Sequence, residues 1–307
     1  MSNVIHSSPT APAGRHVAQR ATLSDALDAR RDTLRGTSGR LAYYADTTAT
    51  GRPLVLIHSI NAAPSSYELR PLFEHYRGKR PVYSLELPGF GHSERPARRY
   101  TPELFATAIN EFLEQVVDAP ADLLALSLSS EFAARAALTA PARVTSLTLI
   151  SPTGFTSREL PSERTGHRLR RILTLPLLGR ALYALVASRP SIRHYLGRSF
   201  TGAPPQALID YAHATSHQPG AHHAPLHFLS TLLFTRKARE RLYSRLTDLP
   251  VLVIADRDPY IDFTALPDFL ADHPNWRSET LAPHLGLPHW EHPEATIATL
   301  DAFWTES

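Results

Sequence analysis

Short apolar segments alternate with amphipathic ones along most of this 307-residue chain, and this alternation limits the folds open to it. The apolar segments predict strands at residues 40–46, 53–59, 81–87, 121–127 and 144–150, and the pattern returns at 249–262. Residues 102–117 instead repeat apolar side chains at helical spacing. Strands that are apolar throughout are typical of a parallel sheet whose two faces are both covered. The sequence therefore predicts an α/β fold with a mostly parallel central sheet and helices on both faces.

Residues 156–245 interrupt this alternation. Strand patterns are absent there, prolines recur, and between Arg158 and Arg198 nine arginines, no lysine and two glutamates leave a net charge of +7. This composition predicts a helical cap inserted after the sixth strand. The chain is then expected to consist of three parts: an N-terminal tail with a short helix near 22–34 (residues 1–38), an α/β core (39–155 plus 246–307) and the cap (156–245).

Two apolar runs of the cap, 172–178 and 181–187, stand beside arginines, and Pro176 should separate them into two short helices. Such helices can turn an apolar face to a substrate pocket and a cationic face outward. One interpretation is a substrate with a hydrophobic tail, together with at most weak association with a membrane surface. The other is that the apolar face packs on the core and the arginines are solvated. The sequence leaves both open.

Composition excludes several classes of site and partner. The chain has no cysteine, so disulfides, thiolate catalysis and cysteine-ligated metals are impossible, and a reducing compartment is favoured. No signal-peptide core and no run of 18 apolar residues is found, so we expect a cytoplasmic protein. The arginines lack interleaved aromatic residues, which argues against nucleic acid. The histidines between His213 and His227 have no carboxylate or cysteine beside them, so we expect no metal.

The segment LLALSLSSEFAARAAL, residues 123–138, predicts a strand that turns sharply into a helix through serines. A sharp strand-to-helix turn exposes a nucleophilic serine only if the residues two before and two after it are small. Around Ser127 these positions are Ala125 and Ser129. Ser127 to Ser130 could instead merely cap the helix, because serine is a good N-cap residue. On this segment alone, nucleophile and cap both remain possible.

Two further segments resemble the α/β-hydrolase superfamily. LVLIHSINAAPSSYELRPLF is similar to the exit of its third strand, where His-Gly-x supplies an oxyanion-hole amide. Here Ser59 replaces the glycine. LELPGFGHSERPARRYTPELF resembles its D-x-P-G-x-G-x-S loop, with Glu86 in place of the aspartate. The resemblance covers about residues 40–155 and 248–305, and it implies the α/β-hydrolase fold.

Carried over by position, the resemblance implies a catalytic role for Ser127 as nucleophile. The backbone N–H groups of Ile60 and Leu128 would then be the oxyanion-hole donors. The acid after the seventh strand would be Asp258 of the ADRDP segment, with Asp256 as the second choice.

The general base is where the sequence departs from the superfamily, which usually ends in G-H-x-P-x-x-E-x-P. The segment HLGLPHWEHPE keeps Pro288, Glu291 and Pro293 and thereby aligns Gly286 with the histidine. Glycine cannot move a proton. His289, three residues later, is the preferred alternative base, and His284, two residues earlier, is the other.

These residues predict a serine hydrolase that needs no cofactor. It would cleave an ester, thioester or amide of a small hydrophobic substrate through an acyl-Ser127 intermediate. Because Gly286 occupies the usual histidine position, two alternatives stay open. One is a non-hydrolytic enzyme of the same fold, a lyase or a C–C bond-cleaving enzyme, and the other is a catalytically silent binding scaffold.

Overall fold

A single eight-stranded sheet forms the centre of the molecule. The computed structural model describes residues 22–156 and 160–307. The strands are β1 (Arg30–Gly36), β2 (Gly39–Asp46), β3 (Leu54–Ile57), β4 (Val82–Glu86), β5 (Ala121–Leu126), β6 (Val144–Ile150), β7 (Val251–Ile254) and β8 (Trp276–Glu279). Their order in the sheet is β1-β2-β4-β3-β5-β6-β7-β8. Only the pairs β1–β2 and β2–β4 are antiparallel, so the predicted mostly parallel sheet is confirmed.

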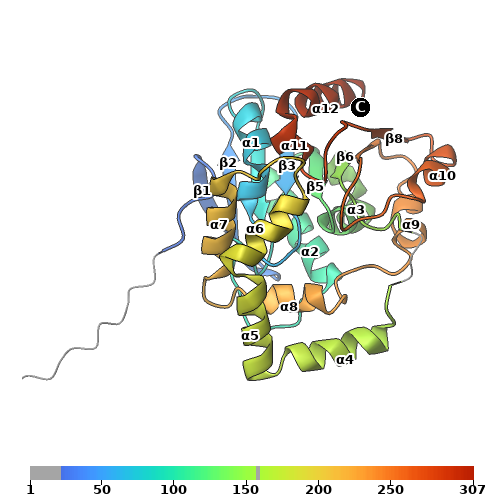
Figure 1. The fold of residues 1–307 in the computed structure, drawn as a ribbon. Helices are drawn as coiled ribbons and strands as arrows, with labels where there is room; N and C mark the ends of the chain where they lie inside the picture. Colours follow the sequence, from blue (N-terminus) through green and yellow to red (C-terminus); the bar gives the residue numbers. More distant parts are fainter. Residues whose placement is uncertain (1–21, 157–159) are drawn as a thin grey trace, which may run out of the picture.

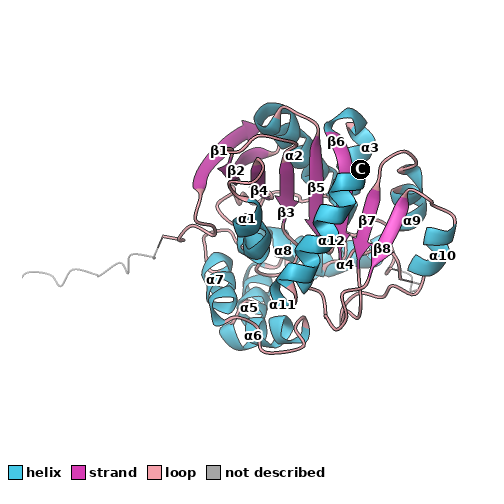
Figure 2. Cartoon of the chain, turned by 90° about the horizontal axis from the view of Figure 1, so that it is seen from above, coloured by secondary structure: helices cyan, strands magenta, loops and turns pink. Residues whose placement is uncertain are grey.

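Helices cover both faces of this sheet, as Figure 2 shows from above. Those of the core are η1 (Ser66–Leu69), α1 (Arg70–Tyr76), α2 (Pro102–Phe112), η2 (Leu113–Val117), α3 (Ser129–Thr139), η3 (Pro141–Arg143), α10 (Leu266–Ala271), α11 (Pro288–Glu291) and α12 (Pro293–Glu306). Alternate residues of β3 belong to two separate buried clusters. Val55 and Ile57 lie in the cluster that includes Phe132 of α3, whereas Leu54 lies in the one that includes Phe303 of α12. The sheet is therefore buried on both sides, as its apolar strands predict.

The N-terminal prediction of a short helix near 22–34 is wrong. Residues 30–36 form the edge strand β1, which pairs with β2 through a two-residue connection between Gly36 and Gly39. Only Leu34 of β1 is buried. The segment therefore has no repeat of apolar residues, at either helix or strand spacing, from which the sequence could identify it. The backbone hydrogen bonds that β2 offers decide its conformation. The predicted tail, residues 1–21, lies outside the described residues.

Helices fill the chain between β6 and β7. They are α4 (Glu163–Leu173), α5 (Pro176–Val186), α6 (Arg189–Arg198), α7 (Gln206–Ser216), α8 (His223–Leu229), α9 (Ala238–Arg241) and η4 (Tyr243–Arg245). The break expected at Pro176 is present, because α4 ends at Leu173 and α5 begins at Pro176. Figure 1 shows α4, α5 and α8 together at one end of the molecule, away from α12. None of the helices in the described ranges combines the length and apolarity needed to cross a bilayer.

Candidate active site

Ser127 stands at a sharp turn between β5 and α3. Its φ of +52° lies in the left-handed region, which a non-glycine residue rarely adopts and which costs about 1–3 kcal/mol. The Ser127 N–H donates to the Ile150 carbonyl at 2.9 Å, and the Ser129 hydroxyl donates to the His58 carbonyl at 2.6 Å. These bonds tie the turn to the neighbouring strands on either side. The N-cap residue of α3 is Leu128, with no side-chain cap bond, so the capping alternative for Ser127 is not observed.

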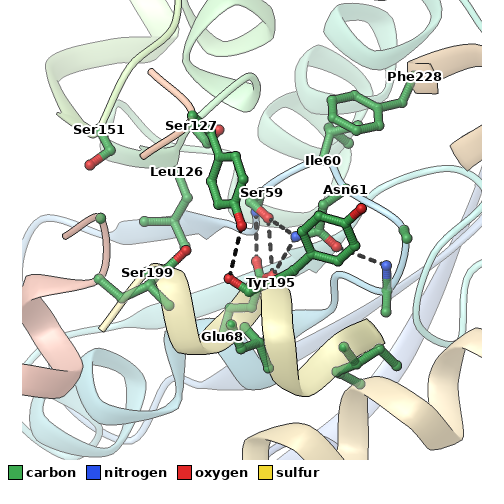
Figure 3. Close-up of a pocket in the computed structure, with 18 of the residues that line it drawn as sticks. Ser59, Ile60, Asn61, Glu68, Leu126, Ser127, Ser151, Tyr195, Ser199 and Phe228 are labelled. Atoms are coloured by element: carbon green, nitrogen blue, oxygen red, sulfur yellow. Dashed lines mark hydrogen bonds between the residues drawn. The ribbon is translucent and has the colours of Figure 1, made fainter. Parts of the chain in front are cut away.

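The turn opens on a cavity of about 320 Å³ at the carboxyl ends of the parallel strands. Ser59, Ser127, Ser151 and Asp258 follow β3, β5, β6 and β7 respectively, and all four line it. Figure 3 shows Ser127, Ser151 and Ser59 around this space. The opposite wall comes from α5 to α8 and is largely apolar: Val186, Ile192, Leu196, Leu208, Ala212 and Phe228. A cavity of this size and character can hold a small, mainly apolar ligand.

The two predicted oxyanion donors flank the elbow. Ile60 lines the cavity, and Leu128 follows Ser127 at the N-terminal end of α3, where the helix dipole favours negative charge. Within residues 22–156 and 160–307, neither backbone N–H has a hydrogen-bond acceptor. Unpaired amides beside a nucleophile can receive a developing oxyanion.

Asp258 presents one oxygen to the backbone and the other to Gly286. Its Oδ1 accepts hydrogen bonds from the amides of Tyr260 at 2.7 Å and Ile261 at 3.0 Å. A Cβ placed on Gly286 would lie 2.8 Å from Asp258 Oδ2. Burial raises the pKa of Asp258 to about 6, against the lowering effect of the two amides and of the Ser151 hydroxyl. Asp256 does not line the cavity, and its Oδ2 accepts the His284 amide at 3.1 Å.

Neither candidate histidine lines the cavity. His289 is fully buried, its Nε2 donates to the Glu68 carbonyl at 2.8 Å, and burial lowers its pKa to about 4. His284 is also fully buried, and its Nδ1 accepts the Gly286 amide at 3.3 Å. The structure thus gathers Ser127, Asp258 and Ile60 at one pocket, and it places no histidine of the described residues in the pocket lining. A catalytic role for either histidine stays a prediction.

Sequence reasoning missed one pocket residue, Glu68. Its carboxylate is buried in the pocket lining, and it accepts hydrogen bonds from the Ser59 amide at 2.9 Å, the Ser59 hydroxyl at 3.0 Å and Asn61 Nδ2 at 3.0 Å. Figure 3 shows this network. Burial raises the pKa of Glu68. Ser59, at the usual glycine position, thus donates hydrogen bonds to this acid. No sequence motif relates the positions of Ser59 and Glu68, so the sequence did not predict this contact.

The loop after β4 is built around Glu86. Gly91 has a φ of +52°, and a Cβ on it would lie 2.0 Å from the Glu86 carboxyl carbon. Only glycine fits there, which explains this position of the P-G-x-G-x-S segment physically. His58 Nε2 accepts the Leu87 amide at 3.0 Å and so joins this loop to the exit of β3. The segments that carry the resemblance therefore support the pocket wall.

The histidine-rich stretch has a mainly structural arrangement. His227 Nδ1 donates to the His223 carbonyl at 2.9 Å, and its Nε2 accepts from Arg170 Nε at 3.0 Å, which joins α8 to α4. The His213 and His217 rings stack at 4.0 Å. In the part of the chain that the structure describes, no three histidine, aspartate, glutamate or cysteine side chains are grouped to hold a metal ion.

Comparisons with known proteins agree with this architecture. The chain is 35% identical over 121 residues to a pimeloyl-[acyl-carrier protein] methyl ester esterase of Aliivibrio fischeri, and 31% identical over 122 residues to the rat 1-acylglycerol-3-phosphate O-acyltransferase ABHD5. Both matches cover 38% of this chain. The first covers 42% of the bacterial relative, and the second covers 33% of the rat relative. The solved structure of an esterase, EaEST, from Exiguobacterium antarcticum superposes with a TM-score of 0.70 at 17% identity, over 90% of this chain and 99% of that one.

Family membership follows from a longer match. The sequence model of the alpha/beta hydrolase family matches residues 54–299, which include strands β3 to β8 and the helices between them. The predicted fold and the predicted membership of a hydrolase family are confirmed. The chain therefore belongs to the alpha/beta hydrolase family.

Proposed function

We propose that this protein is a serine hydrolase that cleaves an ester, thioester or amide of a small hydrophobic substrate through an acyl-Ser127 intermediate. The observation that carries the proposal is the strained backbone of Ser127, held at the carboxyl end of β5 against the cavity. Strain of this kind persists only where the surrounding structure holds it, and it is common at active sites.

The reaction uses the geometry on both sides of the elbow. Ser127 Oγ attacks the carbonyl carbon, and the amides of Ile60 and Leu128 receive the negative oxygen. The hydroxyl proton is transferred to the leaving group, which departs. Water then hydrolyses the acyl-Ser127 ester, which releases the acid and returns a proton to Ser127. The apolar residues of α5 to α8 hold the acyl or alcohol part. The name of the Aliivibrio fischeri relative, a methyl ester esterase, supports carboxyl-ester chemistry.

A second candidate, a non-hydrolytic enzyme or a binding scaffold of the same fold, is favoured by Gly286. The only titratable carboxylates in the pocket lining of the described residues are Asp258 and Glu68, and no imidazole stands among the lining residues. Without a base, a serine hydroxyl is a poor nucleophile at neutral pH. Such a site could still bind and polarise a carbonyl.

Covalent labelling with a fluorophosphonate separates these two candidates. We expect one label per chain on the wild type and none on Ser127→Ala, read by intact mass and by peptide mapping. Ser130→Ala is the matched control, because Ser130 is equally small and fully buried but does not line the cavity. It should label like the wild type. A wild type that stays unlabelled while folded, both alone and with an added nitrogen base, would favour the non-hydrolytic candidate.

A further inference from the structure

The pocket is acidic on its inside. Its lining, all within the described residues, includes the carboxylates of Asp258 and Glu68 but no lysine, arginine or histidine. Glu68 accepts three hydrogen bonds from Ser59 and Asn61. Asp258 receives its two backbone bonds on Oδ1, its Oδ2 lies beside Gly286, and the Ser151 hydroxyl also interacts with this carboxylate. In a largely apolar cavity, such an oxygen attracts a positively charged group or an N–H donor strongly.

Gly286 brings the backbone close to this oxygen. A Cβ at position 286 would lie only 2.8 Å from Asp258 Oδ2, so the Asp258 carboxylate stands where a side chain would begin. The φ of +133° at Gly286 is unfavourable for any other residue, so the backbone itself keeps the position free of a side chain. Ser127, Asp258 and Gly286 all line the same cavity of about 320 Å³.

We propose that the part of the cavity bordered by Ser127, Asp258 and Gly286 is a subsite for a nitrogen base, of the imidazole or amine class. Its N–H donates to Asp258 Oδ2 and its lone pair accepts the Ser127 hydroxyl proton. The base is either part of the substrate or a separate small molecule, and the apolar wall from α5 to α8 holds the rest of the substrate. The binding stands on the geometry alone, whereas its catalytic consequence rests on the proposed function.

The bound base completes the acylation step. As the bond from Ser127 Oγ to the carbonyl carbon forms, the π electrons of the carbonyl move to its oxygen, and the serine proton moves to the nitrogen. When the bond to the leaving group breaks, the leaving group takes that proton and the base becomes neutral again. Water repeats both transfers on the acyl-Ser127 ester, so no other reactant is needed.

Binding is tested first, with imidazole as the probe and saturation-transfer NMR as the readout. We expect saturable binding to the wild type that Asp258→Asn abolishes, because asparagine keeps the Oδ1 acceptor for Tyr260 and Ile261 but loses the negative oxygen. Asp256→Asn is the control: it removes a charge two residues away that does not line the cavity, and it should bind imidazole like the wild type. Circular dichroism checks that each variant is folded. Equal binding to wild type and Asp258→Asn would overturn the proposal.

Turnover distinguishes the two sources of the base. With a neutral p-nitrophenyl ester, imidazole should accelerate hydrolysis by about 10²-fold, the lower end for general-base catalysis, after subtraction of the rate with Ser127→Ala. Without imidazole, an ester that carries an amine near its carbonyl should react faster than its neutral isostere if the substrate brings the base. Acceleration by imidazole alone, with no preference for the amine, indicates a separate molecule.

The outcomes separate this inference from the proposed function. If fluorophosphonate labels Ser127 but imidazole neither binds nor accelerates turnover, the subsite is wrong and the hydrolase stands. If imidazole binds in a manner dependent on Asp258 but Ser127 never reacts, the subsite stands and the hydrolase is wrong.

A second, independent observation concerns the outer surface of α4 and α5. Six large apolar side chains there are exposed, and we call them the α4–α5 face: Leu169, Ile172, Leu175, Leu177, Leu178 and Leu185. Leu177 is 87% exposed and Leu185 67%. The exposed arginines beside them have no ion-pair partner within residues 22–156 and 160–307: Arg164, Arg168, Arg171 and Arg180. Apolar side chains flanked by unpaired cations are typical of helices that lie on anionic bilayers.

We also propose that the α4–α5 face binds the surface of an anionic bilayer. The charge complementarity of its arginines with acidic headgroups selects this partner over a neutral one. The consequence reaches the pocket, because Val186, which follows the exposed Leu185 on α5, lines the cavity. Helix α5 therefore carries both part of the α4–α5 face and part of the pocket wall.

Co-sedimentation with vesicles of phosphatidylcholine, with and without phosphatidylglycerol, tests this surface. Binding should need phosphatidylglycerol, weaken with added salt, and fall by about fivefold for each of Arg168→Gln and Arg171→Gln. Leu177→Ser with Leu185→Ser should also reduce it. The control is Arg30→Gln with Arg35→Gln on β1, which should bind like the wild type. Unchanged binding in the α4–α5 variants would overturn the proposal, and so would a dimer in solution that Leu177→Ser dissociates.

Discussion

The loops that follow β3, β5, β6 and β7 and the helices α5 to α8 form opposite walls of one pocket, but they are built differently. The strands that support the loops are fully buried; Leu56 of β3 and Leu124 of β5 are both 0% exposed. The helices rest in part on small apolar clusters, such as the one whose buried members are Leu173, Tyr183, Ala187, Ala221 and Leu226. They also leave leucines in solvent. The first wall can hold strained, reactive geometry, whereas the second is suited to vary and to move.

Removal of the Ser127 hydroxyl tests the rigid wall most directly. Ser127→Ala should lower the rate of any ester hydrolysis by about 10⁴-fold or more, because a nucleophile acts as part of one unit with its partners. The alanine keeps the backbone conformation, so the midpoint of thermal unfolding should hardly change. Activity against p-nitrophenyl esters and a thermal melt measure the two quantities. Retention of most of the activity would show that the rigid wall is not the reactive one.

A pair of truncations compares the stability of the two walls. Phe132 of α3 is fully buried and stacks on Phe105 with ring centroids 4.7 Å apart. Phe132→Ala should therefore lower the free energy of unfolding by about 3–5 kcal/mol. Leu177→Ala on α5 should change it by less than about 0.5 kcal/mol, because its side chain is already in solvent. Urea unfolding measures both. A large loss at Leu177 would mean that this helix is covered in solution.

Substitution of His289 and His284 tests whether these buried histidines support the fold or take part in the reaction. His289→Ala removes a donor from the Glu68 carbonyl, which Trp290 Nε1 also contacts at 2.7 Å, and we expect a loss of about 1–3 kcal/mol of stability. Turnover per folded molecule should fall by less than about tenfold, and His284→Ala should behave similarly. Urea unfolding and steady-state kinetics give both numbers. A fall in kcat as deep as that of Ser127→Ala would identify the mutated histidine as the base.

A pH dependence of stability is expected from Asp258. Burial raises the pKa of this carboxyl from 3.8 in the unfolded chain to about 6, so between these values the folded state holds a proton that the unfolded state has released. Its contribution to stability therefore decreases as pH rises from about 4 to about 6. Asp258→Asn removes this titration, and it should be more stable than the wild type by on the order of 2 kcal/mol at about pH 7.

Below about pH 4 the difference should vanish, because Asp258 is then protonated in both states. Asp256→Asn, with the same charge change in the same loop, serves as the control for nonspecific charge effects. Urea unfolding at a series of pH values measures the profile. A variant less stable than the wild type at neutral pH would show that the Asp258 charge is better compensated than its burial indicates.

Much of the architecture could be predicted because local pattern and tertiary environment agree in it. Strands β3, β5 and β6 are mainly apolar, and in the structure they are buried almost throughout. Small residues around Ser127 allow the elbow, and Gly91 and Gly286 sit where a side chain would meet a carboxylate. Edge strand β1 failed as a prediction because a single buried leucine carries no periodic signal.

The sequence by itself determined the α/β alternation, the position of Ser127 and the lack of an imidazole at Gly286, since each depends on residue type and on neighbours a few positions away. Only the tertiary structure decided the remaining groups of the site. Glu68 enters the pocket through contacts with Ser59, and His289 is withdrawn from it by the Glu68 carbonyl 221 residues away in sequence. Such placements depend on how separate elements pack and on which buried donors need acceptors, and no local spacing encodes either.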